Sequence, residues 1–289
     1  MKKNEQKTFK NVLQNSVLQY GSNIALSMVG GDPITYRQFG EKVDIISKIL
    51  QKRGIVKGDK VAILSENKPQ WGIAFFAITT LGAIAVPILP EFHANEIRHI
   101  IRHSEAKAIF ISQDQYNKLE DVEMESLRTI FHINDFSIIP PNTTTDKLKE
   151  IIKEGGVEFS KLRDSAMKLL YPAQGSLKED DVASIIYTSG TTGHSKGVEL
   201  THKNFIFDAE ATLKIQNVTE DDRLLSILPL SHFYFFYILG FISTGLHSQR
   251  SWRGVQSVHY SLKIHCHPEL ACHGVVSGRI HQLAEKTEV

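Results

Sequence analysis

A hydroxyl- and glycine-rich stretch of the chain ends in a lysine and directly follows an apolar run. The run covers residues 182–186 and resembles a strand. Glycines let the backbone turn its N–H groups toward an anion, hydroxyl groups add donors, and a lysine adds a compact positive charge. The candidate binding residues are Thr188, Ser189, Gly190, Thr191, Thr192, Gly193 and Lys196. This combination of residue types predicts a loop that binds phosphate groups.

Two other interpretations of the stretch fit less well. The P-loop of nucleoside triphosphatases requires a glycine before the lysine and a serine or threonine after it. Here Ser195 precedes Lys196 and Gly197 follows it. A flexible polar linker has a similar composition. A linker is not expected to be bracketed by Ile185-Ile186-Tyr187 on one side and Val198-Glu199-Leu200 on the other.

The stretch from Thr188 to Gly197, continued to Asn204, resembles the signature loop of the adenylate-forming, AMP-binding enzymes. These include acyl-CoA synthetases, luciferases and the adenylation domains of peptide synthetases. Three more segments resemble the family in the expected order: residues 58–71, residues 81–90 and the motif 228–232, which is common in the long-chain fatty acid branch. The resemblance covers about Asn11 to Gly240. The family usually has proline in place of Ser195, a difference that removes no phosphate-binding group.

The resemblance implies both a fold and a reaction. The fold is α/β, the N-terminal part of the large domain of an adenylate-forming enzyme, with layered parallel sheets flanked by helices. The reaction is attack by a carboxylate on the α-phosphate of ATP, followed by capture of the acyl group by a thiol such as coenzyme A. The implied small molecules are therefore ATP, Mg²⁺ and coenzyme A as co-substrate. Lys196 is the catalytic candidate, because charge moves onto the leaving pyrophosphate.

His232 and Phe233 are the candidate residues of the substrate pocket. Aromatic residues continue from Phe233 to Tyr237, and such a cluster suits an apolar ligand such as a fatty acid. A histidine or an aromatic cluster of this kind is also common in a plain hydrophobic core, so both interpretations stay open. His202 is expected to be structural, in the turn that opens the helix after Leu200.

Alternating strands and helices before the loop favour a parallel sheet covered by helices. Thr35 begins a capping box, and helical spacing continues from there to Gly54. Strands are expected at 60–65, 85–88, 107–111 and 129–133, and helices at 69–81, around 97–101 and at 143–153. Residues 173–180 are expected to be a hinge into a second sheet that carries the phosphate loop. The predicted divisions are a first α/β subdomain at 1–172, the start of a second at 173–246 and an atypical tail at 247–289.

Three motifs of the family are missing from the chain. They are a Thr-Glu motif whose acid holds magnesium, a Thr-Gly-Asp motif whose aspartate binds ribose, and a distant lysine on a mobile C-terminal domain. No residue is therefore assigned as a metal ligand. We expect little or no activity from these residues alone, because the missing magnesium ligand and lysine both act on the transition state.

The last part of the chain differs in composition from the rest. Both cysteines lie after residue 246, histidine is frequent there and aspartate is absent. We interpret the tail as frameshifted or misassembled. The alternative is a zinc site, but its candidate ligands fit no standard zinc spacing. Those ligands are His265, Cys266, His267, Cys272 and His273.

Composition is consistent with a soluble enzyme of one or two domains. The chain has 289 residues, of which 42% are hydrophobic and 22% charged, and its net charge of +1 gives no footprint for nucleic acid. Two cysteines and a polar N-terminus favour a cytoplasmic location. Uncharged runs at 71–90 and 228–246 are long enough to span a membrane. Buried core is the preferred interpretation of both, and peripheral membrane contact stays open.

The sequence therefore predicts an AMP-forming acyl-CoA ligase, an acid–thiol ligase, in a truncated form. The expected substrate is a long-chain fatty acid, and the expected partners are small molecules: fatty acid, ATP and coenzyme A. The alternative is a non-catalytic remnant of the family that binds a nucleotide or an acyl group without turning it over.

Overall fold

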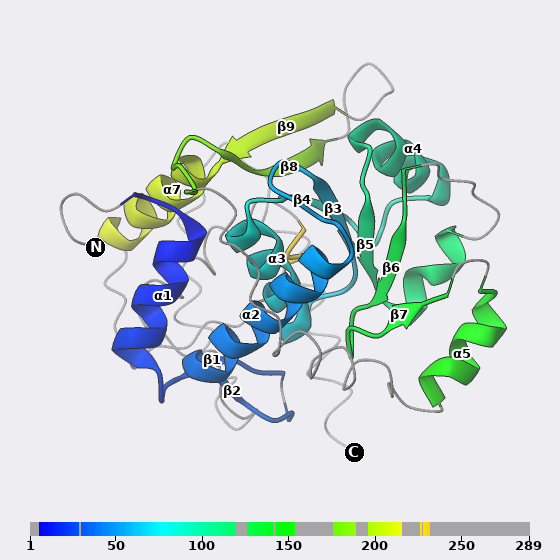
Figure 1. Cartoon of the computed structure of the whole chain (residues 1–289), viewed down its shortest axis with the longest axis horizontal. Coiled ribbons are helices and arrows are strands. Elements are labelled where there is room, and N and C mark those ends of the chain that lie inside the picture. The colour runs from blue at the N-terminus through cyan, green and yellow to red at the C-terminus, as the bar shows by residue number, and fades with distance from the viewer. Residues whose placement is uncertain are drawn as a thin grey trace, which may run out of the picture. The chain divides into compact units, whose positions relative to one another are not determined.

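The computed structural model describes residues 6–28, 30–119, 126–140, 143–153, 176–188, 196–215, 226 and 228–231. The chain divides into two units, Met1–Gln249 and Arg250–Val289, and all described residues belong to the first. Seven strands of this unit form one sheet: β3 (Lys60–Leu64), β4 (Ile84–Ile88), β5 (Ala108–Ile111), β6 (Thr129–His132), β7 (Ile138–Ile139), β8 (Val182–Thr188) and β9 (Lys196–Thr201). Their order is β7-β6-β5-β3-β4-β8-β9 (Figure 1).

The five central strands of the sheet run parallel, and the two outer ones do not. The parallel pairs are β6–β5, β5–β3, β3–β4 and β4–β8. The outer strands β7 and β9 pair antiparallel with β6 and β8. A separate two-stranded sheet consists of β1 (Ile24–Leu26) and β2 (Ile34–Thr35). The mixed α/β class and the mostly parallel sheet predicted from the sequence are confirmed.

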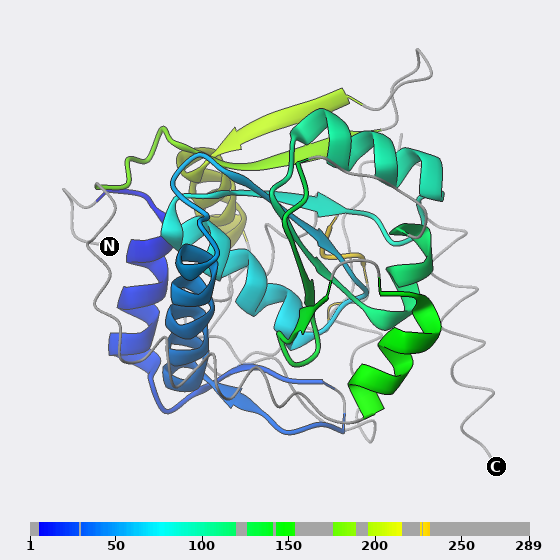
Figure 2. The same ribbon diagram turned by 45° about the vertical axis from the view of Figure 1, so that its right-hand side comes forward.

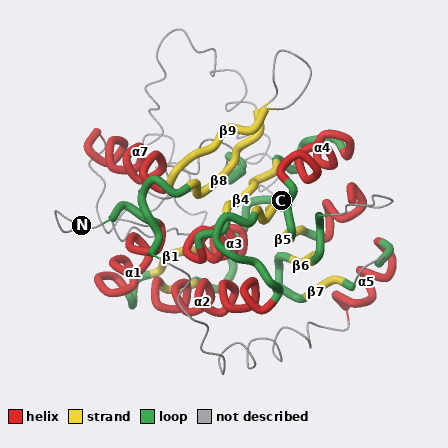
Figure 3. Tube along the Cα trace, turned by 45° about the horizontal axis from the view of Figure 1, so that its top comes forward, coloured by secondary structure: helices red, strands yellow, loops and turns green. Residues whose placement is uncertain are grey.

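Helices cover both faces of the seven-stranded sheet (Figures 2 and 3). On one face lie α1 (Phe9–Tyr20), α2 (Tyr36–Lys52), α3 (Pro69–Leu81) and α7 (His202–Ile215). On the other lie α4 (Ala94–Ser104), the 3-10 helix η1 (Gln113–Leu119) and α5 (Thr145–Lys153). Alternate residues of β3 face the two layers, with Val61 and Ile63 in one core and Ala62 and Leu64 in the other. This alternation follows from the two-residue period of a strand.

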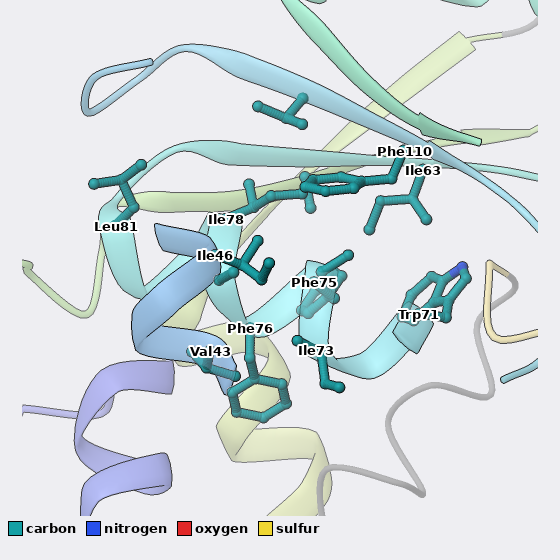
Figure 4. Packing of buried hydrophobic residues seen from close by; sticks show 14 of the residues in the cluster. Val43, Ile46, Ile63, Trp71, Ile73, Phe75, Phe76, Ile78, Leu81 and Phe110 are labelled. Atoms are coloured by element: carbon teal, nitrogen blue, oxygen red, sulfur yellow. The ribbon is translucent and has the colours of Figure 1, made fainter. Parts of the chain in front are cut away.

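Helix α3 is almost completely buried between the sheet and the other helices of its layer. Figure 4 shows Phe75 and Trp71 on α3 beneath Phe110 of the sheet, with Val43 and Ile46 of α2 nearby. Pro69 begins the helix, where its missing N–H group costs nothing, and Gly82 ends it with a φ of 88°. The sequence predicted these bounds, and its interpretation of the run 71–90 as buried core is confirmed.

The run 228–246, for which buried core was also expected, lies mostly outside the described residues. Among the residues that the structure describes, no helix combines the length and the apolar character needed to cross a membrane.

The direction of winding reverses at β3. From β3 the chain passes through α3 to β4 on one side, and from β4 it passes through α4 to β5 on the other side of β3. In open α/β sheets, ligands bind outside the carboxyl ends of the strands at such a reversal. Strand β8 lies beside β4 and runs parallel to it, so its carboxyl end lies at the same edge. We call this edge of the sheet the carboxyl edge.

The prediction of a second sheet after residues 173–180 is wrong. Strand β8 joins the first sheet instead, with Ser184 opposite Ala85, and the Ser184 hydroxyl donates a buried hydrogen bond of 2.9 Å to the Ala85 carbonyl. Apolar strands that are buried on both faces look alike in sequence, so their partners cannot be read from composition. The predicted subdomain boundaries at 172/173 and 246/247 stay predictions, and residues 154–175 and 232–289 lie outside the described residues.

Two glycines of the α3 region should respond to alanine in opposite directions. A methyl group on Gly82 would occupy a left-handed conformation and lie 2.8 Å from Leu177 Cδ2, whereas one on Gly72, within the helix, would lie at an ordinary 3.4 Å from Leu26 Cδ1. We expect Gly82→Ala to lower the free energy of unfolding by about 1 kcal/mol or more, and Gly72→Ala to raise it by up to about 1 kcal/mol. Urea denaturation measures both, and equal effects of the two variants would contradict this account of α3.

Candidate functional site

Strands β8 and β9 form a hairpin whose open end carries the predicted phosphate loop. Thr188 pairs with Lys196, and Tyr187 pairs with Gly197 one step further from the loop. Both Thr188 and Lys196 are exposed. The structure therefore brings the two ends of the loop together at the carboxyl edge. The other predicted binding residues, Ser189, Gly190, Thr191, Thr192 and Gly193, lie outside the described residues.

Gly197 lies where the two strands of the hairpin leave no room for a side chain. A Cβ atom at this position would be 2.8 Å from Ile185 Cγ2 and 3.2 Å from Tyr187 Cζ. The first distance is shorter than a van der Waals contact between carbon atoms. Glycine thus allows β9 to keep its register beside β8, and with it the position of Lys196 next to Thr188.

Strand β8 is fixed at the carboxyl edge by a contact with α4. The Tyr187 hydroxyl lies 2.7 Å from His103 Nδ1, and the two rings meet edge to face. Burial raises the pKa of Tyr187, so its hydroxyl keeps its proton at neutral pH. His103 could not be identified from the sequence, because its partner lies 84 positions away in the chain.

A polar cluster lies at the carboxyl ends of β3 and β5. Glu66 accepts hydrogen bonds from Gln115 Nε2 at 2.7 Å and from Ser112 Oγ at 3.2 Å, and Lys68 Nζ lies 3.5 Å from it. Burial by itself would raise the pKa of Glu66, but these donors outweigh it and lower the pKa. Glu66 is therefore a carboxylate at neutral pH, held in place by residues of two neighbouring connections.

Asn67, the next residue, joins this edge to the family motif at 228–232. Its side chain forms hydrogen bonds with the backbone of Leu228 and Leu230. Leu230 and Ser231 are buried, and Leu230 packs in the same core as α3. The short orange segment in Figure 1 is this part of the chain. His232 and Phe233, the predicted pocket residues, lie outside the described residues.

Among the described residues, no group of three histidine, cysteine, aspartate or glutamate side chains is placed to hold a metal ion. We derive no step through the Mg²⁺ that the resemblance implies. The residues proposed as an alternative zinc site, His265 to His273, lie outside the described residues.

The carboxyl-edge loop, the parallel sheet and the order of the motifs agree with a family of known enzymes. The family model of the AMP-binding enzyme matches residues 13–248, most of the chain. The chain belongs to the AMP-binding enzyme family. The membership expected from the signature loop is thereby confirmed.

Relatives of this AMP-binding chain act on different acids. It is 29% identical over 244 residues to a chloroplast long-chain-fatty-acid–acyl-carrier-protein ligase of Arabidopsis thaliana, a match that covers 81% of the chain and 33% of that protein. It is also 29% identical over 217 residues to a crotonobetaine/carnitine–CoA ligase of Citrobacter koseri, with 74% of the chain and 40% of that protein covered. The chain therefore spans between a third and two fifths of the length of these relatives.

Solved structures of the AMP-binding family share the fold of the chain. The structure of a long-chain-fatty-acid–CoA ligase from Archaeoglobus fulgidus superimposes with a TM-score of 0.67 at 19% sequence identity. The superposition covers 83% of this chain and 46% of that one. At this level of identity the likeness shows the fold alone.

His202 is structural, as the sequence predicted. Its side chain is fully buried, the Phe9 N–H donates to its Nδ1 at 3.2 Å, and its own backbone N–H donates to the Asp181 carbonyl. Burial lowers the pKa of His202 from 6.5 to about 4, although Asp181 acts in the opposite direction. The neutral ring joins α1 to the start of α7, at the opposite edge of the sheet from the phosphate loop.

We expect Gly197→Ala to destabilise the hairpin. The added methyl group must push β9 away from Ile185 and Tyr187, which should lower the free energy of unfolding by about 1–3 kcal/mol. Val198→Ala is the matched control, since Val198 is 46% exposed and should cost less than about 1 kcal/mol. Urea denaturation followed by circular dichroism compares the two, and a Gly197→Ala chain as stable as the unchanged one would contradict the close strand packing.

His202 should make the stability of the fold depend on pH. Its pKa is lower in the folded chain than in the unfolded one, so the unfolded chain binds the extra proton between pH 6.5 and about 4. The free energy of unfolding should therefore fall by as much as about 3 kcal/mol as the pH drops through this window. Carboxylates whose pKa is lowered in the folded chain, such as Asp181, also stabilise the fold. They lose this stabilising contribution only at a pH below the window in which His202 titrates.

The control for this prediction is His202→Asn, in which the amide oxygen can still accept the Phe9 N–H but cannot titrate. Urea midpoints measured at pH 7, 6, 5 and 4.5 should fall more steeply for the unchanged chain than for this variant. Parallel pH profiles of the two chains would show that His202 is not the titrating group.

Proposed function

We propose that this chain is the nucleotide- and acid-binding part of an AMP-forming acyl-CoA ligase. The observation that carries the proposal is the parallel pairing of β8 with β4. This pairing puts the ends of the phosphate loop, Thr188 and Lys196, at the same edge of the sheet as Asn67 and the motif that it holds. A nucleotide and an acid bound at this edge would be close enough to react.

The proposed first step joins the acid to the nucleotide. A carboxylate oxygen of the acid attacks the α-phosphorus of ATP, the bond to the bridging oxygen breaks, and pyrophosphate leaves with the electron pair. Lys196 and the hydroxyl groups of the loop would bind the phosphates and stabilise the negative charge on the leaving group. The loop thus orients the two reactants and neutralises charge, which is most of what such a transfer requires.

The proposed second step transfers the acyl group to coenzyme A. The thiolate of coenzyme A attacks the carbonyl carbon of the acyl-AMP, a thioester forms, and AMP leaves. The acid that we propose is a long-chain fatty acid. The aromatic residues from Phe233 to Tyr237 and the fatty acid named for the Arabidopsis relative support this choice, with His232 and Phe233 as the proposed pocket residues.

A second candidate function is binding without turnover. These residues contain the phosphate loop but no recognisable Thr-Glu or Thr-Gly-Asp motif of the family, which favours this second function. Exchange of labelled pyrophosphate into ATP in the presence of a fatty acid separates the two functions. Exchange supports the ligase, whereas nucleotide binding without exchange supports the non-catalytic module.

Lys196→Ala tests the phosphate loop directly. Loss of a charged contact to phosphate should weaken ATP binding by roughly tenfold to a hundredfold, and any pyrophosphate exchange should slow by about a hundredfold or more. Isothermal titration of the intact chain with ATP and AMP measures the binding. Lys203→Ala is the control, because Lys203 lies at the other end of the hairpin, where it pairs with Glu179. A change of less than about threefold in Lys196→Ala would remove Lys196 from the site, and an unchanged chain that binds neither nucleotide would refute the proposed function.

A further inference from the structure

We infer that His103 is a positioning residue for nucleotide binding. Through Tyr187, His103 holds the open end of the β8–β9 hairpin against α4, and this end carries Lys196. The inference rests on the proposed function, in which Lys196 binds the phosphates of ATP. It adds to that function a residue of a different helix on which the affinity for ATP depends.

The open end of the hairpin extends beyond its pairing with the central sheet. Strand β8 pairs with β4 where Ser184 lies opposite Ala85, and Thr188 follows Ser184 by four residues. Strand β9 is the outermost strand of the sheet, and its residues 196–199 are all exposed. Tyr187 is the last buried residue of β8. The position of Lys196 therefore depends strongly on how Tyr187 is held.

Tyr187 forms a continuous path of contacts from β9 to α4. Its ring lies so close to Gly197 that a Cβ atom on this glycine would be 3.2 Å from Tyr187 Cζ. Its hydroxyl group lies 2.7 Å from Nδ1 of His103, and the two ring centroids are 5.7 Å apart. Figures 1 and 2 show the start of β9 beside α4. Gly197 is the neighbour of Lys196, so the path ends at the proposed phosphate-binding residue.

Helix α4 is a firm support for His103. At its start, Glu96 accepts a hydrogen bond from the His93 N–H at 3.0 Å. Three fully buried side chains fix the helix on the sheet: Ile97, Ile100 and Ile101. His103 lies in its last turn. A positioning residue needs such support, because its precision cannot exceed that of the element that carries it.

The hydrogen bond between His103 and Tyr187 adds direction to the packing of the tyrosine ring. Apolar contacts keep the ring buried, whereas a hydrogen bond also restricts distance and angle. Losing one hydrogen bond of ordinary strength shifts an equilibrium by about two- to tenfold. The apparent affinity of a ligand falls with the fraction of molecules that have the binding arrangement. Displacement of the hairpin end should therefore weaken ATP binding while the rest of the sheet stays folded.

The experiment titrates the intact chain with ATP by isothermal calorimetry. Tyr187→Phe removes the hydroxyl group and keeps the ring, and His103→Ala removes its partner. Each should weaken ATP binding by about fivefold. The double variant should be no weaker than the single ones, because both changes remove the same hydrogen bond. His103→Asn should bind ATP within about twofold of the unchanged chain, since its amide group can replace Nδ1 in this bond.

Tyr116→Phe is the matched control for a purely structural effect. Tyr116 is buried in the same core as Tyr187, and its hydroxyl group donates to the Thr143 carbonyl at 2.9 Å. The control variant loses a hydrogen bond of the same kind at a distance from the hairpin. Its stability to urea should fall about as much as that of Tyr187→Phe, whereas its ATP binding should change by less than about twofold.

Hydrogen exchange measures the hairpin end without any ligand. In Tyr187→Phe, the backbone amides of residues 185–188 and 196–199 should exchange about two- to tenfold faster than in the unchanged chain. The amides of β3 should exchange at the same rate in both chains. The Tyr116→Phe variant should leave the hairpin amides unaffected.

Three results would each overturn the inference: ATP binding unchanged in Tyr187→Phe and His103→Ala, equal weakening of ATP binding in Tyr116→Phe, or unaltered exchange of the hairpin amides. Failure of the unchanged chain to bind ATP would refute the proposed function, and hydrogen exchange would still report whether His103 holds the hairpin. If Tyr187→Phe does not fold, His103→Ala gives the result, because His103 is exposed and its truncation leaves the core intact.

Discussion

The direction of β8 determines whether this chain has a site at all. Because β8 runs parallel to β4, its loop emerges at the edge where β3 and β5 also end. An antiparallel strand in the same place would carry the loop to the opposite edge, where His202 and Asp181 lie. The buried hydrogen bond from Ser184 to Ala85 fixes this pairing inside the sheet. The position of the phosphate loop at the same edge as Asn67 therefore depends on one strand contact that touches neither of them.

The ends of individual helices could be predicted from the sequence, because they are determined by residues close together in the chain. The bounds of α3 follow from Pro69 and Gly82, and those of α2 from the capping box at Thr35, which the structure forms in full. The order of the strands could not be predicted, because apolar composition reports burial and not which neighbour provides it. The sequence accordingly predicts a second sheet for β8, whereas β8 joins the first. The two-residue strand β7 and the helix η1 were not predicted either.

The candidate site was predictable only in part. Residue types and spacing identified the loop, and the structure brings its described ends, Thr188 and Lys196, together. The residues that hold the site in place, His103 and Asn67, carry no such signal in their type or spacing. Asn67 lay within a recognised motif but had no assigned role, since its partners are more than 150 residues further along the chain. The names of the relatives leave the acid open as well, because one acts on long-chain fatty acids and another on crotonobetaine or carnitine.

The hydrogen bond between Phe9 and His202 ties the beginning of the described chain to its last long helix. Phe9 also packs its ring against Phe75, Phe76 and Phe205, the last of which belongs to α7. A ribosome adds about 5–20 residues per second, so roughly 10–40 s separate the synthesis of these two partners. During that interval the residues of α7 against which Phe9 packs do not yet exist. The apolar side of α1 is then exposed to chaperones or to neighbouring nascent chains. The first helix of the described residues to be synthesised is thus among the last to reach its final packing.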